Sequence, residues 1–363
     1  MAKKRIFLNY ATVSPVSRVV YLAVKKYWEE FYKVGPPDVL WKYDPYSELL
    51  AEQAAILLNC HPSEITYTKN TSEAVIIASE ALPLNPGDEI LVLGEEYPAN
   101  FLPWLKKQKD GVTIKVIPHL HGPEAVEMLT RSITANTKVI TMSSAQYYDG
   151  YMADLAAVSK AAKAHGAYFF VDAVQTIGTR ELDLEKIHID MLACGGQKFL
   201  QAGPGIGFLY INKAIMHVLK DFKPGIRSIT GYTQSSYTLK PGAERFQDGT
   251  QNLSGIVALH ASLLSINAKG IKSIEAEYRS KLDQVKAILS KHEIRFIDHG
   301  SNQSNIVSVP VSTAIEAAAY LKNRGVYIKP IKNVARLSFI GTTPASDISA
   351  AAKLLRHYLD TSK

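Results

Sequence analysis

A carboxylate and an amine, each placed directly after an apolar segment, give the strongest chemical signal in the sequence. Asp172 ends the apolar run 167–172, and Lys198 follows the apolar run 189–195. A carboxylate in apolar surroundings is costly unless it meets a cation, such as a protonated pyridine nitrogen. A buried lysine has a lowered pKa, and its neutral amine can form a Schiff base. A water-facing strand-end aspartate and an exposed loop lysine are the ordinary alternatives for each residue alone.

Other apolar segments are followed by groups that could hold a flat, phosphorylated ligand. Thr71 and Ser72 stand where a helix should begin, and a helix N-terminus with hydroxyl groups binds phosphate well. The Tyr97 ring could stack on a heterocycle, and the Gln146 amide could donate to a phenolate or carboxylate oxygen. Capping or loop anchoring explains each residue in isolation. Their shared position after successive strands predicts one common site.

The segments between residues 45 and 211 alternate helical patterns with short apolar runs typical of buried strands. This alternation predicts an α/β fold, a large three-layer α/β/α domain with a mostly parallel sheet. In such sheets ligands bind beyond the carboxyl ends of the strands. The run GPGIGF (203–208) resembles a dinucleotide fingerprint, but a strand pattern follows it where that motif needs a helix, so we reject that interpretation.

The last hundred residues have a different pattern, with two long helical stretches followed by short strand-like and helical pieces. We therefore expect a smaller α+β domain at the C-terminal end. The predicted division gives a large domain over 15–250 and a small domain built from 1–14 and 251–363. The N-terminal segment is expected to pack with the small domain or lie across the site.

The composition limits the possible partners. The 363 residues carry a formal net charge of +7, but the basic residues are dispersed and form no run typical of nucleic-acid binding. The two cysteines, Cys60 and Cys194, are too few for a disulfide framework or a metal-ligand cluster, and we predict no metal site. No signal peptide and no membrane-spanning segment is expected, which favours a cytoplasmic location.

Taken together, these motifs resemble the class V aminotransferase family, within the fold-type I pyridoxal phosphate enzymes. The most specific pieces are VDAVQT (171–176) and GGQKFLQAGPGIGFLYI (195–211), in that order. The resemblance covers nearly the whole chain, from FLNYA (7–11) to the C-terminal helices. The part of the family that the chain resembles includes isopenicillin N epimerase-like proteins and cysteine desulfurases.

The resemblance implies pyridoxal 5′-phosphate as the cofactor. Lys198 would form the Schiff base and move protons, and Asp172 would keep the pyridine nitrogen protonated. The remaining cofactor-binding positions that it implies are Thr71 and Ser72 at the phosphate, Tyr97 on the ring face, Gln146, Gln175 and Gln197 around the ring and the lysine, and Thr250.

The resemblance also implies the substrate site and the assembly. Arg336, in NVARLSFI (333–340), would bind the carboxylate of an amino-acid substrate, and Asn9 would approach it from the N-terminal segment. Thr250, in RFQDGTQN (245–252), would reach the phosphate of a neighbouring subunit, so that the active unit would be a homodimer.

Three departures from the family pattern bear on the reaction. Tyr97 stands where desulfurases carry a histidine, and GVYIKPIKNVARL (325–337) has no persulfide-forming cysteine. Gly195 and Gln197 replace a serine and a histidine that commonly bind the phosphate. We therefore expect an aminotransferase that acts on an amino acid or a related small amine, with a C–S lyase or an amino-acid epimerase as the alternative. A non-catalytic binding module is the remote alternative.

Overall fold

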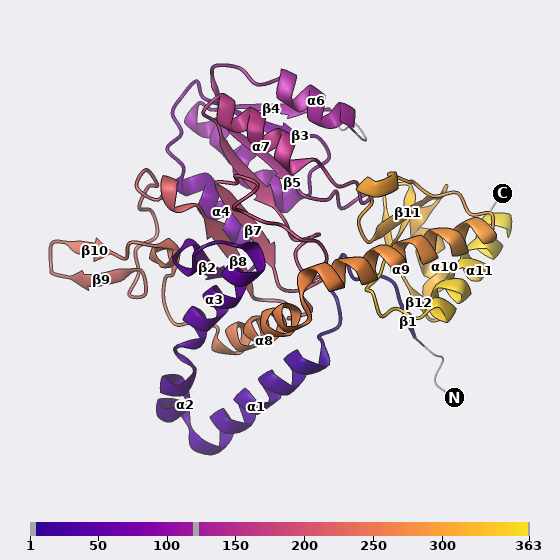
Figure 1. The fold of residues 1–363 in the computed structure, drawn as a ribbon, viewed down its shortest axis with the longest axis horizontal. Coiled ribbons are helices and arrows are strands. Elements are labelled where there is room, and N and C mark those ends of the chain that lie inside the picture. The colour runs from indigo at the N-terminus through magenta and orange to yellow at the C-terminus, as the bar shows by residue number, and fades with distance from the viewer. Residues whose placement is uncertain (1–4, 119–122, 362–363) are drawn as a thin grey trace.

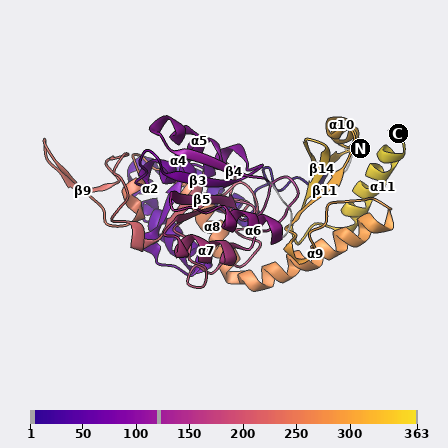
Figure 2. The ribbon, with the colours of Figure 1, turned by 90° about the horizontal axis from the view of Figure 1, so that it is seen from above.

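The computed structural model describes residues 5–118 and 123–361, so the outermost residues of the predicted domain ranges lie outside the described chain. Figure 1 shows a larger body and a smaller one beside it, with the long helix α9 (Ile271–Lys291) running from one to the other. Seen from above, α9 lies along one side of both bodies (Figure 2).

The larger body is built on a seven-stranded sheet in the order β2-β8-β7-β6-β5-β3-β4. Only β8 runs against its neighbours, so the predicted mostly parallel sheet is confirmed. The strands are β2 (Ile65–Thr68), β3 (Glu89–Leu93), β4 (Thr113–Ile117), β5 (Thr137–Ser143), β6 (Tyr168–Asp172), β7 (Met191–Gly195) and β8 (Gly207–Ile211).

Helices cover both faces of this sheet because its strands are apolar on both sides. Along β3, Leu91 and Leu93 belong to one buried cluster and Ile90 and Val92 to the other, as the two-residue period of a strand requires. The first cluster includes side chains of α1 (Arg18–Val34), α3 (Tyr46–Leu58), α6 (Pro123–Arg131), α7 (Leu155–Ala164) and α8 (Leu253–Lys269), and the second those of α4 (Thr71–Ala81) and α5 (Leu102–Lys106). This is the three-layer α/β/α arrangement that the sequence predicts.

The smaller body combines a three-stranded antiparallel sheet with helices, as the sequence predicts for the C-terminal part. Its sheet has the order β11-β14-β13, and β1 pairs with β12 in parallel. Ile6 and Leu8 of the N-terminal segment are buried in its core. The elements are β1 (Ile6–Phe7), β11 (Ile306–Pro310), β12 (Val326–Tyr327), β13 (Lys329–Ile331), β14 (Val334–Ser338), α10 (Ala314–Lys322) and α11 (Ala345–Thr361). The division at residue 250 stays a prediction.

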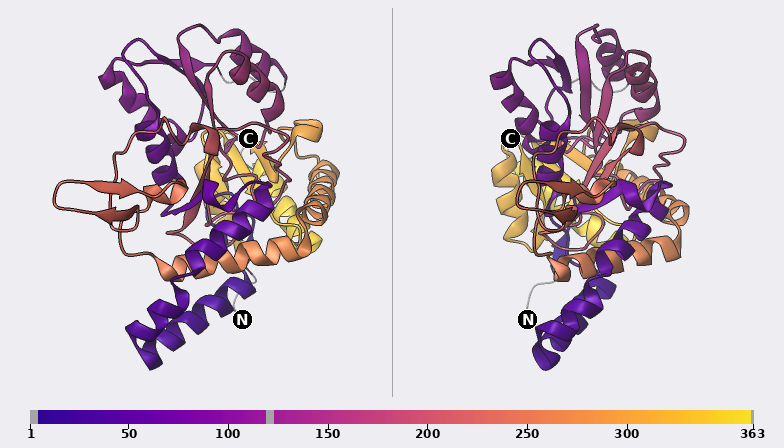
Figure 3. Two further views of the ribbon diagram at one scale, coloured as in Figure 1. Left: turned by 60° about the vertical axis from the view of Figure 1, so that its left-hand side comes forward. Right: turned by 90° about the vertical axis from the view of Figure 1, so that its left-hand side faces the viewer.

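Two parts of the chain project from the larger body. One is the helix pair α1 and α2 (Pro36–Tyr43), and the other is a hairpin of β9 (Ile229–Tyr232) and β10 (Tyr237–Leu239) (Figures 1 and 3). Helix α2 begins with Pro36 and Pro37, and proline is favourable in the first turn because the N–H groups there have no acceptor within the helix.

Candidate active site

The predicted residues meet around a cavity of about 570 Å³ at the carboxyl ends of β5, β6 and β7, closed on its other side by the smaller body. The N-terminal segment forms part of its wall, through Ala11, Thr12 and Val13. The other lining residues are Asn70, Thr71, Ser72, Tyr97, Ala99, Tyr147, Asp172, Val174, Gln175, Gln197, Lys198, Lys329, Pro330, Ile331 and Arg336.

Lys198 lies in a tight glycine-rich turn after β7. Gly203 and Gly205 have φ angles of +83° and +84°, a conformation that side chains with a Cβ rarely adopt. The hydroxyl of Ser14 donates to the Lys198 carbonyl oxygen at 2.6 Å, which ties the turn to the N-terminal segment. The backbone around the amine is thereby fixed on both sides, while the side chain points into the cavity.

Burial lowers the pKa of Lys198 from its usual value to about 8. Desolvation of the ammonium group is the largest cause, the nearby Arg336 guanidinium lowers the pKa further, and the Asp172 carboxylate opposes both. Burial likewise raises the pKa of Asp172 to about 6, although Lys198 opposes that shift. A substantial fraction of the Lys198 amine is therefore neutral near neutral pH and able to attack a carbonyl carbon.

These shifts predict the pH dependence of the apoprotein's reaction with pyridoxal. Because the neutral amine is the reactive form, the rate should rise with pH and reach half of its plateau near pH 8, where the pKa of Lys198 lies. Arg336→Met should move this midpoint upward, since the guanidinium lowers the pKa. Asp172→Asn should move it downward. Borohydride-trapped pyridoxal, counted by mass spectrometry, measures the rate, and a midpoint near that of a free lysine in all three proteins would contradict this account.

Asp172 ends β6, as the sequence predicts. The backbone N–H of Val174 donates to its Oδ1 at 3.0 Å, which fixes the carboxylate in the wall of the cavity. The pyridine nitrogen of a cofactor is a partner that would satisfy such a buried acid.

Glu96 is a buried carboxylate that our sequence interpretation missed. Its oxygens accept hydrogen bonds from the Ser143 backbone N–H at 2.7 Å, the Ser143 hydroxyl at 2.5 Å and the Gln146 amide at 3.0 Å. The Asn100 amide donates as well, at 3.2 Å. Burial still raises the pKa of Glu96, and its charge helps to raise that of Asp172. Glu96 thus anchors the loop that carries Tyr97 to the end of β5.

The phosphate end of the predicted site lies at the start of α4. Asn70 caps this helix by accepting from the Glu73 backbone N–H at 2.9 Å. The backbone N–H groups of Thr71 and Ser72, in the same first turn, have no acceptor within the helix. The Thr71 hydroxyl is buried and has no hydrogen-bond partner among the described residues. An anion fits this position, since it would satisfy both the hydroxyl and the helix N-terminus.

Arg336 lies on β14, is buried and lines the same cavity. Its Nη1 donates to the Tyr147 carbonyl oxygen and its Nη2 to the Thr12 hydroxyl, both at 2.7 Å. Its Nε has no partner among the described residues. The guanidinium is therefore held in place with donor capacity left for a carboxylate.

Tyr97 and Gln175 also lie at the cavity. The Lys198 Nζ is 5.6 Å from the centroid of the Tyr97 ring, so the ring stands beside the amine. The Gln175 amide donates to the Ala11 carbonyl oxygen at 3.2 Å, and its Oε1 is buried without a partner among the described residues.

Three predicted residues do not line the cavity. The Gln146 amide N–H is engaged by Glu96. Asn9 accepts from the Thr12 hydroxyl at 2.7 Å, and so bears on Arg336 only through Thr12. Thr250 lines a separate recess beside Gly205 and Asn252. The roles assigned to these residues stay predictions.

Comparison with known proteins agrees with this geometry. The family model described as "Aminotransferase class-V" matches residues 6–344. The chain belongs to the class V aminotransferase family. Pyridoxal phosphate is its cofactor. The acid at Asp172, the buried amine at Lys198 and the Thr71 hydroxyl, which has no partner in the described part of the chain, suit the ring nitrogen, the aldehyde and the phosphate of that molecule.

Relatives within the class V family carry different names. The chain is 27% identical over 297 residues, 80% of its length and 74% of the relative's, to a "Probable cysteine desulfurase" of Methanothermobacter thermautotrophicus. It is 27% identical over 330 residues, 90% of its length and 86% of the relative's, to an "Uncharacterized aminotransferase YcbU" of Bacillus subtilis.

Solved structures share the class V fold. The cystine C–S lyase C-DES, in complex with its product cysteine persulfide, matches with a TM-score of 0.91 at 20% identity and covers 97% of each chain. The apo cysteine desulfurase of Thermococcus onnurineus NA1 matches with a TM-score of 0.88 at 22% identity, over 98% of this chain and 95% of that one.

The class V cavity of this chain contains no cysteine. Cys194 is fully buried in β7, Cys60 lies after α3, and neither is a lining residue. Burial raises the pKa of the Cys60 thiol to about 12 and that of Cys194 well above its usual value. Only Lys332 and Asn333 join β13 to β14, so the segment before Arg336 has no loop that could carry a cysteine. Lys332 forms an ion pair with Glu95 at 2.6 Å.

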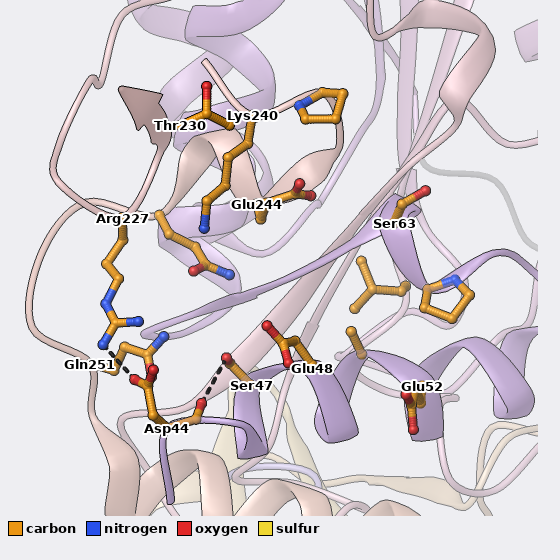
Figure 4. Close-up of a pocket in the computed structure, with 15 residues that line it drawn as sticks. Asp44, Ser47, Glu48, Glu52, Ser63, Arg227, Thr230, Lys240, Glu244 and Gln251 are labelled. Carbon is orange, nitrogen blue, oxygen red and sulfur yellow. Dashed lines mark hydrogen bonds and ion pairs between the residues drawn. The ribbon is translucent and has the colours of Figure 1, made fainter. Parts of the chain in front are cut away.

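A second cavity, of about 480 Å³, lies beside α3 and shares no lining residue with the first. Figure 4 shows that Arg227 reaches Asp44 across it and that Glu48 and Glu52 project from α3. It contains charges of both signs but no site residue predicted from the sequence.

Among the described residues no cluster of metal-ligating side chains occurs, and no helix of that part of the chain is both long and apolar enough to cross a bilayer.

Proposed function

We propose that the chain is an aminotransferase that takes the amino group of a small amino acid, with Lys198 as the proton carrier. Arg336 binds the α-carboxylate of the substrate, Asp172 holds the proton on the ring nitrogen, and Tyr97 stacks on the ring. Thr71 and Ser72 bind the phosphate. The cofactor supplies an electron sink for the charge that develops when a bond to Cα breaks.

The observation that carries this proposal is that Lys198 is the one buried amine among the lining residues, with a pKa of about 8. A single base near neutrality can remove the Cα proton and deliver it, on the same face, to the cofactor carbon that is bonded to the amino nitrogen, which is what transamination requires. Epimerisation needs a second group that delivers a proton to the opposite face. Tyr147 also lines the cavity, but burial raises the pKa of its phenol, so it is a weaker proton donor than a free tyrosine.

Arg336 would set which bond reacts by fixing the substrate's carboxylate. A guanidinium binds a carboxylate in a planar, bidentate manner, and its two existing hydrogen bonds fix the plane. With the carboxylate held at β14 and the amine end at Lys198, the substrate's Cα–H bond can be presented to the lysine. The N-terminal segment contributes Ala11 and Thr12 to the wall of the cavity and so limits the access of water from that side.

Sulfur transfer through a protein persulfide is not supported, since it needs a reactive cysteine beside the substrate. The relatives named cysteine desulfurases therefore indicate the family rather than the reaction of this chain. C–S lyase chemistry needs no such cysteine. It remains the alternative, because it begins with the same removal of the Cα proton.

The test is a single-turnover reaction of the cofactor-loaded protein with aliphatic, acidic and sulfur-containing L-amino acids. A 2-oxo acid together with the amine form of the cofactor would support the aminotransferase. A 2-oxo acid with the aldehyde form retained and sulfide released would identify a C–S lyase, and inverted configuration an epimerase. No reaction with any amino acid, despite bound cofactor, would point to a binding module.

We also propose that the active unit is a homodimer, with Thr250 serving the partner's site. Large apolar side chains are exposed on the projecting parts of the chain: Tyr32 is 91% exposed, Trp41 82% and Tyr232 71%. A two-stranded hairpin such as β9–β10 is marginally stable alone, and exposed apolar surface of this extent is typical of an interface. Thr250 faces a recess outside the cavity of its own subunit.

A mixed dimer tests where Thr250 acts. The Thr250→Ala protein should bind pyridoxal phosphate about tenfold more weakly, for loss of one hydrogen bond to a charged group. If each threonine serves the other subunit, a mixed dimer with Lys198→Ala contains one complete site and should regain both tight binding and turnover. Purified mixed dimers carrying two affinity tags would be titrated and assayed. Failure to regain either property would place Thr250 in its own subunit's site or in none.

A further inference from the structure

Gly195 and Gln197 are the two positions at which the sequence departs from the family's usual phosphate donors. Gly195 is the last residue of β7 and pairs with Gly207 of β8, and Gln197 precedes Lys198. Gly195 has no side chain that could donate a hydrogen bond, whereas the Gln197 amide can donate one. The structure shows that the two positions are not separate.

The side chain of Gln197 occupies the space that a side chain at position 195 would need. A Cβ atom built on Gly195 would lie 2.4 Å from Oε1 of Gln197 and 2.8 Å from Oγ1 of Thr71. Both distances are shorter than real Cβ atoms show, so any larger residue at 195 would displace the Gln197 amide. The amide end of Gln197 therefore lies over Gly195, next to the Thr71 hydroxyl.

The backbone of Gln197 is fixed in a way that favours this placement. Its carbonyl oxygen accepts from the Ser14 backbone N–H at 2.8 Å and from the Ser14 hydroxyl at 3.2 Å. Its side chain lines the cavity beside Thr71, whose hydroxyl is buried and has no partner among the described residues. A half-turn of the amide exchanges its oxygen and nitrogen, so an anion at this place would select the N–H donor.

We propose that Gly195 and Gln197 form one coupled phosphate-binding unit, in which the glycine provides the space and the Gln197 amide donates, together with the Thr71 hydroxyl, to the cofactor phosphate. In this unit the Gln197 amide takes the place of the side-chain donor that Gly195 lacks. This inference rests on the proposed binding of pyridoxal phosphate at Lys198, and it assigns a requirement for glycine to a position that has an ordinary backbone conformation.

The test compares the apoprotein's affinity for pyridoxal phosphate with its affinity for pyridoxal, which lacks the phosphate. Gln197→Ala should weaken pyridoxal phosphate binding about tenfold, the loss expected for one hydrogen bond to a charged acceptor, and leave pyridoxal binding unchanged. Gly195→Ala should give the same result, because its methyl group displaces the amide. The exposed Gln108→Ala controls for loss of an amide elsewhere.

Coupling is tested by the double variants. Gly195→Ala with Gln197→Ala should bind no more weakly than Gly195→Ala alone, since the methyl group at 195 already removes the Gln197 donor. Gly195→Ser with Gln197→Ala should recover most of the lost affinity, because the serine hydroxyl enters the vacated space. Thermal denaturation of each apoprotein, with and without inorganic phosphate, shows whether the variants fold and whether the anion alone reports the same order.

Additive losses in the double alanine variant, or an unchanged affinity in Gly195→Ala, would overturn the coupling. Equal losses for pyridoxal and pyridoxal phosphate would also overturn it, because they would show that the phosphate is not the group recognised. If the unmodified protein forms no covalent link with either aldehyde, the proposed function itself fails. That result is distinct from any pattern among the variants.

Discussion

Replacing Lys198 by alanine is expected to abolish turnover and the covalent attachment of the cofactor. Lys198 is the only buried amine among the residues that line the cavity, and it carries out both attachment and proton transfer in the proposed reaction. General acid–base catalysis alone contributes roughly 10²- to 10⁴-fold. We therefore expect a loss of about 10³-fold or more, measured as the single-turnover rate with the best amino-acid substrate.

The absorbance of the cofactor makes this result specific. The unmodified protein should show a visible band that borohydride reduction fixes onto Lys198 in a peptide map, and the variant should show neither. Lys332→Ala is the matched control, because it also removes a lysine near the cavity, one that is paired with Glu95 instead of lining the wall. Retained turnover in Lys198→Ala, or a borohydride-fixed cofactor on another lysine, would refute the assignment.

The residues at the strand ends were predictable because topology alone brings them together. In a parallel sheet the carboxyl ends of all strands lie at one edge, so an apolar run followed by a polar residue places that residue at the edge. Thr71, Tyr97, Asp172 and Lys198 follow four such runs, and all four line one cavity. No knowledge of side-chain packing was needed to group them.

The residues that position this group were not predictable in the same way. Glu96 precedes Tyr97 and has no distinguishing pattern in sequence. It matters because Ser143 and Gln146 reach it from the end of β5, although Asn100 donates to it from the same loop. For the same reason the amide of Gln146 was assigned to the cofactor, whereas the structure engages it with Glu96. A buried carboxylate is recognised by its donors, and those donors are known only after folding.

The substrate end of the cavity depends on contacts between segments that are distant in sequence. Arg336 is separated by more than 300 residues from Thr12, to whose hydroxyl it donates. Family resemblance indicated the arginine, but the threonine that orients it was not identified. Asn9 was predicted from the same segment, but it accepts a hydrogen bond from the Thr12 hydroxyl and does not line the cavity. A segment's approach to a site can thus be inferred from sequence while the residue that makes the contact is not.

Replacing Asp172 by asparagine is expected to lower turnover while leaving the cofactor attached to Lys198. The amide has nearly the same shape, and its oxygen can still accept from the Val174 backbone N–H, so the wall of the cavity should keep its form. It carries no negative charge, however, and so cannot hold a proton on the pyridine nitrogen. Without that proton the ring is a weaker electron sink, and removal of the Cα proton by Lys198 becomes slower.

The size of the effect follows from the loss of a buried charge pair, for which truncation of one partner costs roughly 2–5 kcal/mol. A loss of about 10²- to 10³-fold in the single-turnover rate is therefore expected, while the covalent link to Lys198 keeps the cofactor attached. Asp190→Asn is the matched control: it also converts a buried carboxylate that accepts a backbone hydrogen bond, from Phe169 at 2.8 Å, but lies outside the cavity. A single-turnover rate of Asp172→Asn within about threefold of that of the unmodified protein would correspond to less than about 1 kcal/mol. Asp172 would then not control the ring nitrogen, and its burial would serve the fold alone.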